Sequence, residues 1–202
     1  MQFLIKEVPS VIVTRMIEQN VWQESCPVPI YRLKLLDVSH YNFENQISRG
    51  QLVVLDRLAQ NVLDIFKELF ALKFPVHSIK LIDEFGGSDD LSMAANNSSC
   101  FNFRYVANSS SFSMHSYGLA IDINPLQNPC LVKNNQSSDI NIAPEAGKEF
   151  LDRSNQRKGM VEPIVKIFEK YGFDWGGNWS DPIDYHHFQV PRVMVDKLIT
   201  IT

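Results

Sequence analysis

Two short segments of the chain combine histidine and aspartate in patterns that suit metal binding. The first reads SMHSYGLAIDINP and contains His115 and Asp122. The second reads DPIDYHHFQV and contains Asp184 and His187. Zinc in hydrolases is commonly held by three histidine or carboxylate side chains, with a water molecule in the fourth position. His115, Asp122 and His187 would make such a set, and Asp184 would then be free to act on the water.

The first segment is predicted to contain a strand that begins near Tyr117. Its apolar residues alternate onto one face, while small residues and the carboxylate occupy the other. His115 and Asp122 are an odd number of residues apart, so a regular strand would place them on opposite faces. A bend at Tyr117 and Gly118 would bring the imidazole round, because glycine tolerates the backbone angles that such a bend requires.

His186 is the rival of His187 as a metal ligand. Residues 187–190 are predicted to form a strand in which His187 and Gln189 share one face and His186 points the other way. We therefore prefer His187. The same spacing is also compatible with a histidine at the edge of the core and an aspartate at the end of a strand, without a metal.

Longer sequence patterns point to a known family. Ser-x-His-x-x-Gly-x-Ala-x-Asp, followed by Ile-Asn-Pro, resembles the first metal motif of the zinc D-Ala-D-Ala carboxypeptidase and L-alanyl-D-glutamate endopeptidase family, the peptidoglycan metallopeptidases of the M15 type. The run from Trp175 to Trp179, followed by Asp-x-x-His-Phe from Asp184, resembles the second motif. Asn-Phe-Arg, ending at Arg104, resembles the segment that carries the active-site arginine of the family.

The resemblance implies a role for each of these residues. It implies Zn²⁺ as the cofactor, held by His115, Asp122 and His187. Asp184 would take a proton from the metal-bound water. The Arg104 guanidinium would bind the substrate's carboxylate or the oxyanion that forms on the attacked carbonyl.

Substrate contacts are assigned to Ser113 and Trp179. One of the two tryptophans in the second motif would wall the cleft, with the alternative that both fill the core. Gln189 departs from the family pattern, in which many relatives carry Glu after His-Phe. A neutral side chain there would orient a metal ligand less strongly than a carboxylate.

The resemblance also implies the architecture. We expect an α+β fold of the Hedgehog and D,D-peptidase type, with a small, mainly antiparallel sheet, packed helices and the zinc in a surface cleft. The length of 202 residues suits a single domain, residues 1–202. The motif core covers residues 96–190, and residues 1–45 form a poorly matched N-terminal extension.

Periodicity and turn-forming residues predict further elements. They indicate helices at 55–70 and 159–171, strands at 78–85 and 101–104, a loop at 39–45 around a surface His40, and an irregular polar stretch at 131–159.

The composition excludes other classes of protein. The chain is 45% hydrophobic and 21% charged, which is ordinary for a globular protein. Its net charge is −4 and it has no basic run, so nucleic acid is not an expected partner. No apolar stretch approaches the ~20 residues that cross a bilayer, so no transmembrane segment is expected. We expect a monomer.

The N-terminal sequence and the cysteines bear on the cellular compartment of the protein. The apolar run at the N-terminus is too short for a signal peptide. We expect a periplasmic or extracellular, cell-wall-associated protein if a signal was removed, and a cytoplasmic one if the chain is complete. Cys26, Cys100 and Cys130 are expected as free thiols, with a bridge between Cys100 and Cys130 as the alternative in an oxidising compartment.

These expectations give one leading hypothesis, a zinc-dependent peptidase that hydrolyses peptidoglycan stem peptides with a metal-activated water. The bond remains open between carboxypeptidase removal of a terminal D-Ala and endopeptidase cleavage between L-Ala and D-Glu. The alternative is a non-catalytic, zinc-containing module that binds peptides or cell-wall fragments. Such a module would be expected to lack the base or a ligand, whereas all of these residues are present here.

Overall fold

The computed structural model describes residues 1–107, 109–134 and 139–200. These residues form a mixed α+β structure with small, mainly antiparallel sheets and several short helices, which confirms the expected fold class. The strands are β1 (Phe3–Glu7), β2 (Leu33–Tyr41), β3 (Ile47–Leu55), β4 (Ser78–Ile79), β5 (Asn97–Ser98), β6 (Ala120–Asp122), β7 (Cys130–Lys133), β8 (Ile140–Ala143), β9 (Asp174–Trp175), β10 (Ile183–Asp184) and β11 (His187–Gln189). The α-helices are α1 (Ser10–Glu18), α2 (Ala59–Ala71), α3 (Asp89–Ala94), α4 (Val165–Lys170) and α5 (Val195–Ile199).

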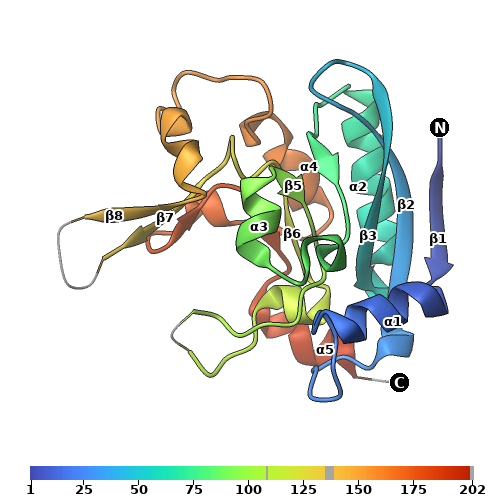
Figure 1. Ribbon diagram of the computed structural model, residues 1–202. Helices are drawn as coiled ribbons and strands as arrows, with labels where there is room; N and C mark the ends of the chain where they lie inside the picture. The colour runs from blue at the N-terminus through green and yellow to red at the C-terminus, as the bar shows by residue number, and fades with distance from the viewer. Residues whose placement is uncertain (108, 135–138, 201–202) are drawn as a thin grey trace.

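The N-terminal part of the chain forms a sheet covered by a helix. β1, β2 and β3 pair in that order, all antiparallel, and α2 packs against this sheet (Figure 1). The apolar stripe of α2 is buried, with Val62, Ile65, Phe66 and Leu69 each at most 2% exposed. Complete burial of one such side chain stabilises a fold by roughly 1.5–3 kcal/mol. This layer is therefore a rigid support for the central strands of the molecule.

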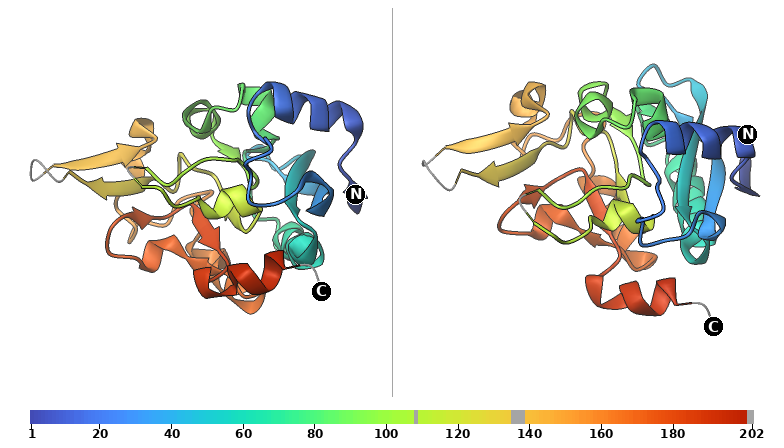
Figure 2. Two further views of the ribbon diagram at one scale, coloured as in Figure 1. Left: turned by 90° about the horizontal axis from the view of Figure 1, so that it is seen from below. Right: turned by 60° about the horizontal axis from the view of Figure 1, so that its bottom comes forward.

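Three smaller sheets complete the fold. β6, β11 and β9 form an antiparallel sheet with β11 in its centre, β10, β7 and β8 form another, and β4 pairs with β5 in parallel. The hairpin of β7 and β8 extends away from the body of the molecule, as Figures 1 and 2 show.

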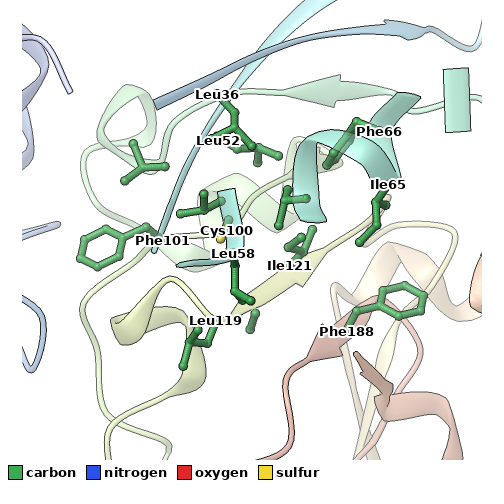
Figure 3. Close-up of a cluster of buried hydrophobic side chains, with 14 of the residues drawn as sticks. Leu36, Leu52, Leu58, Ile65, Phe66, Cys100, Phe101, Leu119, Ile121 and Phe188 are labelled. Carbon is green, nitrogen blue, oxygen red and sulfur yellow. The ribbon is translucent and has the colours of Figure 1, made fainter. Parts of the chain in front are cut away.

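One hydrophobic core joins the N-terminal sheet to the central strands. Figure 3 shows side chains of this cluster, among them Leu36 from β2, Leu52 from β3 and Ile121 from β6. Ile121 and its neighbours Leu119 and Ile123 are completely buried. The expected apolar face of this strand is thus the face that packs into the core.

Helix α2 confirms the expected helix at 55–70, although it begins at Ala59 rather than at residue 55. Asp56–Leu58 forms a 3₁₀ turn before it. The expected helix at 159–171 is shorter, because Glu162–Ile164 is a 3₁₀ turn that contains Pro163 and only Val165–Lys170 is α-helical. Proline lacks an N–H and fits only the first turn of a helix.

Three of the sequence-based expectations are wrong. The stretch 101–104 is not a strand: the N–H groups of Phe101, Asn102 and Phe103 donate to Val53, His115 and Val21, which lie in three different segments, so no ladder forms. The expected strand at 78–85 ends at Ile79 and gives way to a 3₁₀ turn, Ile82–Phe85. The stretch 131–159 is not irregular throughout, because it contains β8 and all but the first residue of β7, which pair as a partly exposed hairpin of four-residue strands.

His40 is the fourth correction. It lies in β2 and is 4% exposed, whereas the sequence predicted a surface loop. The turn-forming residues act only at the tip of the β2–β3 hairpin, where the Asn42 side chain accepts hydrogen bonds from the N–H groups of Glu44 and Gln46. The strand continues up to that tip.

Two further observations concern membrane-spanning helices and the cysteines. Within the described residues, no helix has the length and apolar character needed to span a bilayer. Cys26, Cys100 and Cys130 are free thiols.

Gly118 gives a prediction about stability. Its φ is +66°, and a Cβ added there would lie 2.6 Å from the backbone N of Leu55. Gly118→Ala should therefore suffer both backbone strain and a clash that no side-chain rotation relieves, and lose roughly 2 kcal/mol or more of unfolding free energy. The measurement is urea denaturation.

Gly172→Ala is the matched control. Its φ is +86°, but a Cβ there meets nothing within 4 Å. This variant should show the strain alone, about 1 kcal/mol. Equal losses in the two variants would contradict the close approach of Gly118 to Leu55.

His40 gives a prediction about pH. Burial lowers the pKa of His40 below its ordinary value of 6.5, against the weaker opposing effect of hydrogen bonds with the backbone of Tyr41 and Val76. The unfolded chain therefore binds the proton more tightly. The stability that neutral His40 contributes is complete above pH ~6.5 and is lost as the pH falls towards the folded-state pKa.

Urea unfolding at pH 5, 6 and 7 tests this expectation. Wild-type stability should fall towards pH 5 more steeply than that of His40→Asn, by up to about 1.4 kcal/mol per pH unit. Parallel pH profiles for the two proteins would show that His40 is not the group responsible.

Candidate functional site

Strand pairing brings the three predicted ligands together. β11 runs antiparallel to β6 with His187 directly opposite Asp122. His115 comes from a 3₁₀ turn, Met114–Tyr117, which ends at Gly118 in the left-handed region. The expected bend therefore exists, and it turns the imidazole of His115 towards the strand pair.

The ligand atoms of this trio converge. His187 Nδ1 lies 2.9 Å from Asp122 Oδ1, His115 Nε2 lies 3.2 Å from Asp122 Oδ2, and the two imidazole nitrogens are 3.2 Å apart. One ligand atom from each residue lies within 4.8 Å of the others, and all three residues are buried. Two imidazoles and a carboxylate in this arrangement match the donor set of catalytic zinc.

The second nitrogen of each imidazole is held by an acceptor. His115 Nδ1 lies 2.5 Å from the carbonyl oxygen of Cys100, and His187 Nε2 lies 3.0 Å from Gln189 Oε1. These nitrogens donate, because their partners are oxygen acceptors. His115 Nε2 and His187 Nδ1 are then the nitrogens left to face the centre of the trio with a lone pair, which is the form that binds a metal.

The charge state of Asp122 also suits a ligand. Burial alone would raise the pKa of this carboxyl. The neighbouring imidazoles of His115, His186 and His187 outweigh burial and hold the pKa of Asp122 well below its ordinary value. Asp122 is therefore ionised at neutral pH and available as an anionic ligand.

Asp184 lies in β10, opposite Cys130 of β7, and lines the same cleft as His187 of the trio. Its nearest basic neighbour is His186, whose Nε2 is 3.0 Å from Asp184 Oδ1. That oxygen is buried and has no well-aligned hydrogen-bond donor in the described part of the chain. A carboxylate with a buried oxygen left incompletely paired is typical of a functional position.

His186 is turned away from the trio. Its Nδ1 donates to the carbonyl oxygen of Asn128 at 2.8 Å, and its Nε2 approaches Asp184. The structure therefore groups His187, and not His186, with His115 and Asp122. The ligand assignment itself remains a prediction.

Glycine allows the second motif to approach the site closely. Gly176 begins a 3₁₀ turn, and a Cβ on it would lie 2.6 Å from the carbonyl oxygen of Asp184 and 3.3 Å from that of His187. Any larger residue at this position would push away the segment that carries both side chains.

Arg104 enters the site from an irregular segment fixed to the first motif. Its N–H donates to Ser116 Oγ, and its carbonyl oxygen accepts from the N–H of Ser113. The guanidinium Nη2 lies 3.0 Å from Asp89 Oδ2, while its Nε is buried without a hydrogen-bond partner among the described residues. Part of the guanidinium is thus available to a ligand.

A cleft of about 470 Å³ collects these side chains. Its lining includes Arg104, Ser113, Trp179, Asp184 and His187. The ring centroid of Trp179 lies 5.3 Å from that of His187. Trp179 therefore walls the cleft beside the trio, whereas Trp175 packs against the core and donates its N–H to the carbonyl oxygen of Tyr185.

Sequence reasoning missed two neighbours of the functional side chains. Asp89 pairs with Arg104, and His186 contacts Asp184. Asp89 lies in a polar stretch with no spacing that relates it to residue 104, so no signal could have found it. His186 was visible only as a rival ligand, because its partners depend on where the loop at Asn128 lies.

Comparison with known proteins agrees with this geometry. The family model described as D-alanyl-D-alanine carboxypeptidase, of the M15 type, matches residues 107–190. The comparisons with curated proteins and with solved structures gave no match. The matched segment contains both metal motifs and ends at β11, while Arg104 lies just before it. The resemblance of the two motifs is therefore confirmed, and the segment that carries them matches the M15-type peptidase family.

Proposed function

We propose that this protein is a zinc-dependent peptidase that hydrolyses peptidoglycan stem peptides. The observation that carries the proposal is the buried trio of His115, Asp122 and His187, whose lone pairs converge beside a cleft that also holds Asp184. The family match supports a peptidase. The assignment of zinc, of the stem peptide and of each catalytic role is part of the proposal.

The donor set fits zinc and defines what the chain's own residues would do. His115, Asp122 and His187 would hold the ion. Bound zinc supplies a water of pKa about 7 and polarises a carbonyl oxygen. The Cys100 carbonyl oxygen and Gln189 keep the two imidazoles in the tautomers that ligation requires.

The remaining residues would move the proton and bind the peptide. Asp184 takes a proton from the attacking water as the new C–O bond forms. When the C–N bond breaks, Asp184 returns that proton to the leaving amine. Arg104 binds a carboxylate of the substrate or the oxyanion on the attacked carbon, and Ser113 and Trp179 contact the peptide at the rim.

The bond cleaved divides the proposal into two forms. Removal of a terminal D-Ala needs a cleft that receives the free carboxylate of the substrate. The guanidinium of Arg104 would bind that carboxylate. Cleavage between L-Ala and D-Glu needs a cleft that receives a chain on both sides of the bond. Products of the two reactions differ in mass and are separated by the same assay.

Metal content gives the first prediction for this site. His115→Ala and His187→Ala should each lose zinc, because two remaining ligands hold it weakly. His186→Ala should retain it, since His186 contacts Asp184 and Asn128 instead of the trio. Elemental analysis of the purified variants measures this.

Full zinc occupancy in both His115→Ala and His187→Ala would contradict the ligand set. Loss of zinc in His186→Ala, with retention in His187→Ala, would identify the rival as the ligand.

Turnover gives the second prediction. Asp184→Asn should keep zinc but lose about 10²- to 10⁴-fold in kcat on stem peptides, because an amide cannot accept the water's proton. Asp181→Asn is the control, since Asp181 is exposed and contacts the backbone of Lys133. Activity of Asp184→Asn within a few-fold of wild type would show that another group is the base.

A further inference from the structure

A second cavity lies directly beside the cleft. Its volume is about 480 Å³, close to the ~470 Å³ of the cleft. Trp179 lines both spaces. Asp174, on the cavity side, pairs in register with Gln189, on the cleft side. The cavity and the cleft are therefore neighbours that share the Trp179 indole and adjoin the β9–β11 strand pair.

Aromatic rings form much of this second cavity. Phe173, Trp175 and Trp179 line it, but Phe173 is only 1% exposed and Trp175 stacks on the buried Phe188. Trp175 packs against the core, and its N–H is donated to the carbonyl oxygen of Tyr185, so the ring available to a ligand is that of Trp179. The ring face of tryptophan is the strongest aromatic site for a cation.

The charged side chains of the cavity are all acidic. Glu169 and Asp174 line it, and among the described residues that line it none is Lys or Arg. Glu169 is paired with Lys166 at 2.5 Å. Asp174 forms no ion pair in the described part of the chain, so its charge is available to a ligand.

We propose that this cavity binds a primary ammonium group of the substrate. The combination of the Trp179 indole and an unpaired carboxylate suits a cation held by one ring face and by one charge. The shared wall at Trp179 places this group on a part of the peptide remote from the scissile bond. The inference rests on the proposed peptidase function and adds to it a preference for peptides that carry a free amine.

Paired peptides test the preference. Stem peptides that contain lysine are compared with the same peptides carrying Nε-acetyl-lysine, which removes the charge and keeps the chain length. The free-amine peptides should have a kcat/KM about threefold to tenfold higher, mainly through KM, because the contact binds ground state and transition state alike. The ratio should shrink at high salt.

Two variants locate the effect. Asp174→Asn should reduce the ratio of the two kcat/KM values towards one. Glu18→Gln, an exposed acid in α1, should leave the ratio at its wild-type value. An unchanged ratio in Asp174→Asn, or the absence of any preference in the wild type, would overturn the proposal.

A binding measurement keeps this test independent of catalysis. N-acetyl-lysine amide should shift the indole N–H resonances of Trp175 and Trp179 in the NMR spectrum of the protein, and its Nε-acetylated form should do so much less. If no peptide is cleaved, the peptidase proposal fails while these shifts still decide on the cavity. Equal shifts with both compounds, or none with either, would show that the cavity does not select an ammonium group.

Discussion

The pairing of β6 with β11 is the constraint on which the rest of the site depends. It places Asp122 opposite His187, and these two residues supply two of the three converging ligand atoms. Side chains alternate along a strand, so a slip of one residue would turn the imidazole or the carboxylate to the other face. The site is therefore specified by register before any metal is considered.

The hydrophobic core, which packs on the apolar face of the β6–β11 pair, fixes that register. Phe188, between His187 and Gln189, is completely buried and stacks on Phe168 with the ring centroids 3.9 Å apart. Ile121, next to Asp122, is also completely buried. A slipped β11 would expose an aromatic side chain and bury a polar one, and each change costs on the order of a few kcal/mol. The apolar face of the strand pair thus holds the polar face in place.

Hydrogen bonds then orient the imidazoles of His115 and His187. The carbonyl oxygen of Cys100 and the side chain of Gln189 each occupy one nitrogen of an imidazole and leave the other to the centre. Gln189 is neutral, so it fixes the tautomer of His187 without adding a negative charge. The ligand would be less basic than one held by a carboxylate.

The sequence predicted the fold class and the local geometry around His115 and His187, but not every element. The bend at Gly118 and the shared face of His187 and Gln189 follow from local spacing, and the structure has both. The strand after the bend is Ala120–Asp122, so it begins later than the expected start near Tyr117. The irregular path of 101–104 could not be predicted, because its hydrogen bonds go to three segments that are distant in sequence. The β7–β8 hairpin was missed because each of its strands has only four residues, the shortest length at which alternation indicates a strand.

The central claim is that this trio makes the protein a metal-dependent peptidase, and mass spectrometry of its products tests that claim most directly. Peptidoglycan fragments are incubated with the zinc-loaded protein, with chelated protein and with chelated protein to which zinc is restored. We expect either loss of a terminal alanine or release of peptides that begin at D-Glu, abolished by the chelator and restored by zinc. Fragments left intact by protein that demonstrably binds zinc would contradict the account and favour a binding module instead.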